Sequence, residues 1–200
     1  LQSTTNTRDV GGLPTADGGW MRRGVLFRTD AVLAPTAADR ELLAGLGLRH
    51  AIDFRSQPEV ESLGGNQFGD GVQVRVLPLV DEGTAVLGEA MIRALRDRDV
   101  ALAVETLGDG RARELGLLGP TNLVRSVTVR RAFAEVLRLI ASDDGAPLIF
   151  NCTAGKDRTG VFAALVQRLV GVADEVIVDD YLLSNTLRAD HNAMSYQHLS

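Results

Sequence analysis

The sequence predicts an α/β fold in which helices flank a mainly parallel central sheet. Short apolar runs alternate with stretches of helical periodicity along the chain, a pattern typical of strands connected through helices. Two hundred residues suit a single domain, taken as residues 1–200, with a real hydrophobic core. Apolar residues make up 45% of the chain and charged residues 24%, an ordinary balance for a globular protein.

The first half of the chain is expected to hold three strands and one helix. The strands are predicted at residues 24–29, 48–55 and 71–80. The helix is expected within PTAADRELLAGLG, because Thr36 and Asp39 have the spacing of a capping box and Gly47 can end the helix. The polar stretch SQPEVES after the second strand is predicted to be a turn.

The second half is predicted to be mostly helical. Residues 85–107 have a helical pattern, and the glycine-rich residues 108–121 are expected to form a mobile connection. Residues 85–121 together are a candidate lid-like helical insertion. Further helices are expected at residues 129–142, at residues 159–170 and in ADEVIVDDYLLSN, with a short buried strand, APLIF, between the first two.

Charge, apolar patterning and cysteine content argue against several classes of protein. The net charge of −5 and the pI near 5.2 argue against a nucleic-acid partner, so any anion site must be local. No run of about 18 apolar residues is present, so no membrane span is expected. The start of the chain has no apolar run of the signal-peptide kind. One cysteine cannot form an internal disulfide, which favours a reducing compartment, and we expect a cytoplasmic protein.

The stretch PLIFNCTAGKDRTGVFAALV is the candidate site. It reads as a strand, a tight loop and a helix, and ligands in α/β sheets gather beyond the carboxyl ends of strands, where helix N–H groups are free. Five residues separate Cys152 from Arg158, so the loop must curl, and Gly155 supplies the backbone freedom. The curl turns amide N–H groups inward to form an anion-binding nest. The expected phosphate-binding residues are Thr153, Ala154, Gly155, Lys156, Asp157, Arg158 and Thr159.

The loop chemistry suits a cysteine nucleophile. A thiol of pKa about 8.5 is only roughly 3% ionised at pH 7. A helix N-terminus, a ring of amides and the Arg158 guanidinium all favour the thiolate of Cys152, and lowering its pKa by about three units corresponds to about 4 kcal/mol. The same groups would stabilise a phosphoryl group during transfer, since arginine can hold two phosphate oxygens at once.

Two other interpretations of this loop fit the sequence less well. A lone cysteine after an apolar strand is more often a structural core residue, but Gly155, Lys156, Asp157 and Arg158 would be poor core residues. A nucleotide-binding P-loop does not fit, because Phe150 stands where that motif needs its first glycine.

The motif C-x-x-G-K-D-R-T-G resembles the signature loop of bacterial tyrosine-protein phosphatases that are related to the dual-specificity and phosphoinositide phosphatases. Other segments are also similar to that family: NTRDVGG, LFRTDAV, DFRSQPEV and DDYLLSN, which together span residues 6–185. The resemblance implies the cysteine-phosphatase fold, a phosphocysteine intermediate, no metal or other cofactor, and a helical lid. It implies substrates among proteins carrying phosphotyrosine, phosphoserine or phosphothreonine, and phosphoinositides.

One position departs from the family pattern. The family usually has histidine immediately before the cysteine, whereas this chain has Asn151. Asparagine can hydrogen-bond the loop backbone but cannot carry a positive charge, so weaker or more alkaline activity is expected. A pseudophosphatase that binds phosphorylated ligands without turnover is therefore the alternative function. A rhodanese-like sulfurtransferase also uses a loop cysteine, but it has no obvious need for the Lys-Asp-Arg-Thr series.

Two carboxylates are candidates for the general acid. The resemblance favours Asp157, inside the loop, while Asp81 at the end of a strand could approach from a neighbouring loop. Lys156 is expected at the mouth of the site, where its charge would attract acidic groups. The Thr159 hydroxyl is expected to cap the helix or hydrogen-bond the cysteine sulfur. Asn151 and Gly160 are expected to support the loop, Gly160 by letting the helix pack tightly against the strand.

The remaining notable side chains have structural predictions. Arg55 is expected to pair with Asp9 or Glu59, and Trp20 to pack in the interior. Arg8 and Asp9 are expected to tie down the N-terminus, and Asp180 and Asn185 to brace the loop from the last helix. His50 and His191 lack neighbours that suggest a metal site.

Overall fold

A computed structural model describes residues 1–80, 93, 97, 99–190 and 193 of the chain. Within them, five strands form one sheet in the order β1-β2-β5-β3-β4. The strands are β1 (Arg8–Asp9), β2 (Leu26–Thr29), β3 (His50–Asp53), β4 (Gln73–Val76) and β5 (Leu148–Asn151). Only β1 runs antiparallel to its neighbour; the other three pairings are parallel. The predicted α/β fold with a mainly parallel sheet is therefore confirmed.

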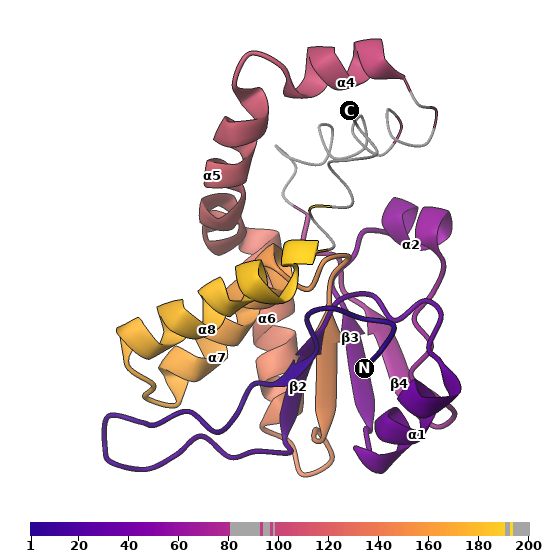
Figure 1. Cartoon of the computed structure of the whole chain (residues 1–200). Helices are drawn as coiled ribbons and strands as arrows, with labels where there is room; N and C mark the ends of the chain where they lie inside the picture. The colour runs from indigo at the N-terminus through magenta and orange to yellow at the C-terminus, as the bar shows by residue number, and fades with distance from the viewer. Residues whose placement is uncertain (81–92, 94–96, 98, 191–192, 194–200) are drawn as a thin grey trace.

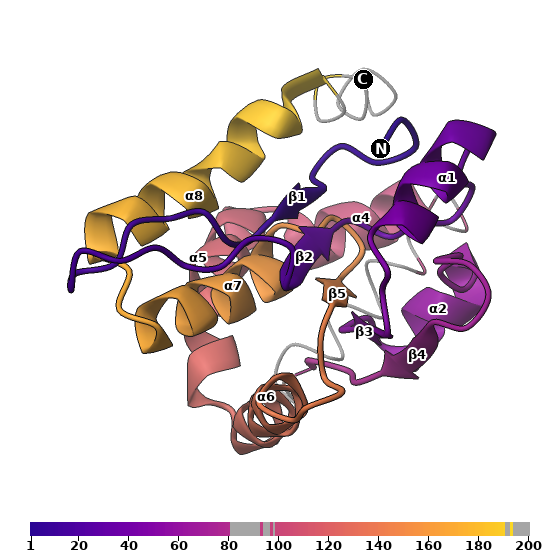
Figure 2. The same cartoon turned by 90° about the horizontal axis from the view of Figure 1, so that it is seen from below.

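Helices cover both faces of this sheet, and others lie beyond its end. The described helices are α1 (Ala37–Gly45), α2 (Gln57–Leu63), α4 (Val100–Leu107), α5 (Arg111–Arg125), α6 (Val127–Ile140), α7 (Asp157–Leu169) and α8 (Asp174–Leu187). Figure 2 shows α1 and α2 on one side of the row of strands and α6 and α7 on the other, with α8 alongside α7. The predicted capping box of α1 is present, since Thr36 and Asp39 each accept a hydrogen bond from the other's backbone N–H.

The central strand β5 is buried on both faces, which fixes the start of the loop that follows it. Leu148 and Phe150 belong to the core beneath α6 and α7, while Ile149 belongs to the smaller core beneath α1. This division follows from the two-residue repeat of a strand. Phe150 meets Phe162 of α7 edge to face, with ring centroids 5.0 Å apart. The loop after Asn151 therefore leaves a rigid strand and enters a helix that packs against that strand.

Three local predictions were wrong. SQPEVES is not a turn but opens helix α2, in which Ser56 and Glu59 form a capping box. The predicted mobile connection at residues 108–121 is mostly helix α5, which contains Pro120 and buries Leu123 in the main core. Packing against α6 and α7 therefore outweighs the poor helix propensity of its glycines and proline. Trp20 is 70% exposed and does not pack in the interior.

The candidate lid is described only in part. Helix α4 confirms the end of the helical pattern predicted for residues 85–107, whereas residues 85–92, 94–96 and 98 lie outside the described residues, as does Asp81. Figure 1 shows α4 and α5 standing beyond the end of the sheet where β5 meets α7. A lid function for residues 85–121 stays a prediction. None of the helices described here is both long and apolar enough to reach across a bilayer.

Candidate active site

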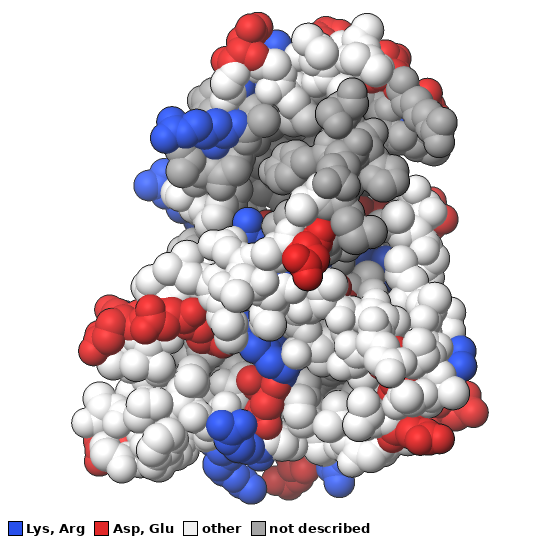
Figure 3. Space-filling view, viewed as in Figure 1, with Lys and Arg blue, Asp and Glu red and all other residues white. Residues whose placement is uncertain are grey.

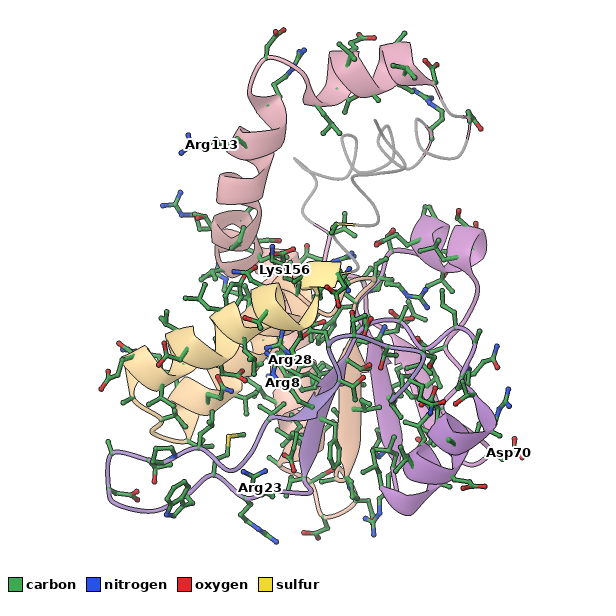
Figure 4. All side chains as sticks on the ribbon, viewed as in Figure 1. Arg8, Arg23, Arg28, Asp70, Arg113 and Lys156 are labelled. Carbon is green, nitrogen blue, oxygen red and sulfur yellow. The ribbon has the colours of Figure 1, made fainter. Side chains whose placement is uncertain are left out.

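The candidate loop connects the carboxyl end of β5 to the first turn of α7. β5 ends at Asn151, the loop runs from Cys152 to Lys156, and α7 begins at Asp157. Figure 4 places Lys156 at the end of the sheet where the strands finish. Figure 3 shows acidic side chains gathered over the start of α8, whose first turn holds Asp174 and Glu175. The surface near the start of α8 is thus acidic, in keeping with the net charge of −5.

The carbonyl groups of the loop are occupied by donors from other parts of the fold and, at Lys156, from the first turn of α7. Their hydrogen bonds are Ala31 N to Thr153 O (3.2 Å), Arg188 Nη1 to Ala154 O (3.1 Å), Arg28 Nη2 and Asn6 Nδ2 to Gly155 O (2.7 and 2.8 Å), and Gly160 N to Lys156 O (2.8 Å). By contrast, no backbone N–H of residues 153–159 donates to any residue that the structure describes. The loop and the first residues of α7 thus keep seven consecutive N–H donors for a ligand, which is the character of an anion-binding nest.

The donors behind the loop are buried and include two cations. Arg28 and Asn6 are 0% exposed, and Arg188 is also buried. Burial, followed by the positive charge of Arg8, lowers the pKa of Arg28 to about 10, although Asp180 acts in the opposite direction. Arg28 therefore stays charged at neutral pH directly behind the loop. Asn6 and Arg28 lie in segments that resemble the family, but the sequence had assigned neither of them a role.

Two glycines permit the close contacts around the loop. Gly155 has a φ of +61°, and a Cβ atom at this position would lie 2.5 Å from the carbonyl oxygen of Thr29. The prediction that the curl needs glycine here is confirmed. Gly160 serves a different contact from the one predicted. A Cβ there would lie 2.5 Å from the ring of Tyr181, so Gly160 makes room for helix α8 rather than for the strand.

Arg158 is held by Glu59, a residue that the sequence had not placed in the site. The carboxylate accepts from Nη1 at 2.7 Å and from Nη2 at 2.6 Å, and it also accepts from the Thr153 hydroxyl at 2.5 Å. Burial alone would raise the pKa of Glu59, but the hydrogen bond and charge of Arg158 outweigh it and lower that pKa to about 2. Glu59 is thus ionised and ties both ends of the loop to α2.

The hydrogen bonds of Arg158 leave one edge of its guanidinium open. Nη1 donates to Glu59 and to Phe54 O, at 3.3 Å for the latter, and Nη2 donates once to Glu59. A guanidinium has five N–H donors, so Nε and the second N–H of Nη2 have no partner among the described residues. These two form the planar fork that can take two oxygens of one phosphate.

Cys152 lies among core residues and is 3% exposed, which by itself would suit a structural cysteine. Arg158 is the cation of the same loop. Burial lowers the pKa of Arg158, but the Glu59 hydrogen bond and nearby negative charges raise that pKa above the usual arginine value, so Arg158 stays charged. The Thr159 hydroxyl is buried without a hydrogen-bond partner in the described structure, so its predicted bond to the sulfur or helix end is absent.

Asn151 belongs to a polar network beneath the loop. Its Nδ2 group donates to Asp53 at 3.4 Å and to the carbonyl of Cys152 at 3.3 Å, and its Oδ1 atom accepts from Asn66 at 3.1 Å. Asn151 is fully buried. The side chain therefore hydrogen-bonds the backbone at the cysteine, as predicted for a loop-supporting residue.

Arg55 has a different partner from those predicted. It pairs with Asp53, whose carboxylate it meets through both Nε and Nη2, rather than with Asp9 or Glu59. Asp9 instead accepts hydrogen bonds from the backbone of Gly11 and Gly24.

The last helix supports the loop through intermediate side chains rather than by direct contact of the two predicted residues. Asp180 binds Arg8 at 2.9 Å and Arg28 at 3.5 Å, and Arg28 in turn donates to Gly155 O of the loop. Asn185 makes no side-chain hydrogen bond to a described residue. The neighbouring Ser184 does, accepting from Asn6 at 3.2 Å and Arg28 at 3.4 Å.

The two candidate acids and Lys156 complete the site. Asp157 is exposed at the first turn of α7 and Lys156 is half-buried beside it, whereas Asp81 lies outside the described residues. Within the described part of the chain, no group of three or more histidine, cysteine or acidic side chains could hold a metal ion.

Comparisons with known proteins agree on one family. The sequence pattern of the tyrosine phosphatase family matches residues 1–199. A Cupriavidus necator protein, whose name assigns it provisionally to the tyrosine-protein phosphatases, is 36% identical over 195 residues, which cover 96% of this chain and 64% of that protein. The triple specificity protein phosphatase PtpB of Mycobacterium tuberculosis is 33% identical over 199 residues, covering 92% of this chain and 68% of PtpB.

More distant proteins also match. A Nostoc commune tyrosine-protein phosphatase is 31% identical over 170 residues, covering 79% of this chain and 51% of that protein. A solved structure of Pseudomonas aeruginosa TpbA with phosphotyrosine is 16% identical, with a TM-score of 0.42 and coverage of 82% and 70%. The family pattern spans nearly the whole chain, and two relatives are 36% and 33% identical across more than nine tenths of it, so the chain belongs to the tyrosine phosphatase family.

Proposed function

We propose that the chain is a phosphomonoester hydrolase that removes phosphate from phosphorylated protein side chains through a phosphocysteine intermediate. The observation that carries this proposal is the loop itself: residues 153–159 keep their N–H groups free while other parts of the fold hold the loop carbonyls. Family membership supports the reaction class.

In the proposed first step, the Cys152 thiolate attacks phosphorus. The S–P bond forms as the bond from phosphorus to the leaving oxygen breaks, and that oxygen takes a proton from Asp157. The loop N–H groups and the open edge of Arg158 hold the three remaining phosphoryl oxygens.

In the second step, water attacks the phosphocysteine. Asp157, now ionised, accepts a proton from that water, the S–P bond breaks, and phosphate and the Cys152 thiolate are released. Cys152 and Asp157 thus act in both halves of the reaction.

The proposed substrates begin with phosphotyrosine proteins and extend to phosphoserine, phosphothreonine and phosphoinositides. One relative is named a triple specificity protein phosphatase, which supports a broad range. Lys156, half-buried at the mouth, adds positive charge that favours acidic substrates.

A pseudophosphatase is the second candidate function, because Cys152 is 3% exposed and Asn151 contributes no charge. Such a protein would bind phosphorylated ligands in the same loop without turnover.

Hydrolysis of p-nitrophenyl phosphate and of phosphotyrosine, phosphoserine and phosphoinositide substrates, with a metal chelator present, tests these proposals. We expect turnover by the native chain and none by Cys152→Ser. A native chain that binds phosphopeptide but releases no phosphate between pH 5 and 8 would contradict the hydrolase and support the pseudophosphatase.

A further inference from the structure

Tyr181 of α8 connects the last helix to the proposed general acid. Its hydroxyl donates a hydrogen bond to Oδ1 of Asp157 at 3.3 Å. The ring passes close to the backbone of α7, since a Cβ atom on Gly160 would lie 2.5 Å from ring atom Cε2. The packing of α7 against α8, visible in Figure 2, thus determines where this hydroxyl lies.

The hydroxyl remains a donor throughout the useful pH range. Burial, and then the negative charge and hydrogen bond of Asp157, raise the pKa of Tyr181 to about 12. Tyr181 therefore donates a proton in this hydrogen bond and cannot compete as a base.

The bond leaves the two carboxylate oxygens of Asp157 inequivalent. Oδ1 accepts from Tyr181, whereas Oδ2 accepts from no residue that the structure describes. A carboxylic acid carries its proton on the oxygen that is not already accepting, so the neutral form of Asp157 is expected to be protonated at Oδ2. Asp157 is otherwise exposed at the start of α7, and without this bond its side chain would be free to rotate.

We propose that Tyr181 is a positioning residue for proton transfer: by holding Oδ1 of Asp157 it keeps the acid proton on Oδ2, directed to the leaving oxygen. This inference rests on the hydrolase function proposed above. In the first step, the Oδ2–H bond breaks as the leaving oxygen gains the proton. In the second step, Oδ2 accepts the proton that the attacking water loses.

The leaving group decides how much this positioning matters. A p-nitrophenolate ion leaves readily without a proton, whereas an alkoxide from phosphoserine needs one. General acid catalysis contributes typically 10²- to 10⁴-fold, and losing orientation but keeping the acid should remove a part of that factor, roughly 5- to 20-fold. A loss confined to poor leaving groups is a signature that a merely structural role would not produce.

The test is the dependence of kcat/KM on the leaving-group pKa for a series of aryl phosphates and for a phosphoserine peptide, because kcat/KM reports the steps up to departure of the leaving group and not the hydrolysis of the phosphocysteine that all substrates share. Tyr181→Phe keeps the ring against Gly160 and removes only the hydroxyl. We expect its kcat/KM to match the native chain for p-nitrophenyl phosphate and to fall about 5- to 20-fold for the phosphoserine peptide. In an Asp157→Asn background, Tyr181→Phe should have no further effect on the slope.

Leu182→Ala, at an exposed neighbouring position on α8, is the matched control and should leave the series unchanged. Equal kcat/KM values for Tyr181→Phe and the native chain across the series would overturn the inference, as would a uniform loss of kcat/KM for all substrates. A native chain without turnover of p-nitrophenyl phosphate would instead contradict the hydrolase function itself, so the two failures are distinguishable.

Discussion

Two arginine–carboxylate pairs flank the end of the central strand, and they differ in what they leave free. Arg55 meets Asp53 through Nε and Nη2, the same edge that arginine uses for phosphate, and its Nη1 donates to the carbonyl of Gly64. Arg158 meets Glu59 through Nη1 and Nη2 and keeps the edge formed by Nε and Nη2 available. Both pairs are close to bidentate, but only Arg158 is oriented to accept an oxyanion.

The two pairs also differ in how deeply their side chains are buried. The side chains of Arg55 and Asp53 are 0% and 2% exposed, whereas those of Arg158 and Glu59 are 22% and 14% exposed. A fully buried pair mainly fixes conformation, because neither charge can reach solvent or a ligand. The comparison indicates that Arg55 organises the base of the site and Arg158 completes its binding surface.

The largest expected effect is on stability, from Arg55→Met. Removing one partner of a buried ion pair leaves the Asp53 charge uncompensated, which costs about 3–5 kcal/mol of unfolding free energy. Urea unfolding of the variant and the native chain measures the change. We expect the folded fraction of the variant to keep most of its p-nitrophenyl phosphate turnover. A variant that folds stably but is inactive would contradict the structural role given to Arg55.

Arg158→Lys should reduce activity strongly and stability only slightly, the opposite of Arg55→Met. Lysine keeps the charge but loses the planar fork, and removing a preorganised transition-state donor reduces kcat about 100- to 1,000-fold. The midpoint of urea unfolding should change much less than in Arg55→Met. Turnover retained within a few-fold would show that the free edge of the Arg158 guanidinium is not used.

Glu59→Gln tests the Arg158–Glu59 pair through the pH dependence of stability. Because the pKa of Glu59 in the folded chain is lowered from 4.5 to about 2, its ionised form stabilises the fold above pH 4.5, and this stabilisation is lost as the pH falls toward 2. The shift corresponds to about 3 kcal/mol. Stability measured from pH 6 to pH 2 should fall more steeply for the native chain than for the variant. Parallel curves would contradict the role given to Glu59.

The smallest effect is expected for Arg188→Ala, behind the loop. Its hydrogen bond to Ala154 O is one of several that hold the loop carbonyls, so its loss should weaken phosphopeptide binding by about 1 kcal/mol. Titration of Cys152→Ser and of the double variant with the same phosphopeptide checks this. Arg188→Lys should restore part of the binding; a variant that binds as tightly as its parent would show that the other donors suffice.

Local features of the site could be predicted from the sequence, because strand, loop and helix are contiguous there. The curl at Gly155, the positions of Asp157 and Arg158 and the support from Asn151 all follow from a few neighbouring residues. Glu59 was missed although the Ser56–Glu59 capping-box spacing and Pro58 indicated a helix start. The polar composition of this stretch favoured a turn, but its capping residues begin a helix.

Other parts of the site depend on contacts that no local pattern encodes. Arg28 is 127 residues from Gly155 in the chain, and Asn6 is 149 residues from it. Their roles become visible only once the N-terminal segment, β2 and the loop are brought together. Helix α5 illustrates the same limit for the fold, since glycine and proline favoured a loop and packing made a helix.

The central claim is that the free donors of the loop and Arg158 support a covalent step at Cys152. The most direct test is mass spectrometry of the intact chain and of its peptides after a rapid denaturing quench during p-nitrophenyl phosphate turnover. We predict one phosphoryl group on the peptide containing Cys152, absent from Cys152→Ser. Steady turnover with no covalent species, or with the phosphoryl group on another residue, would contradict the account.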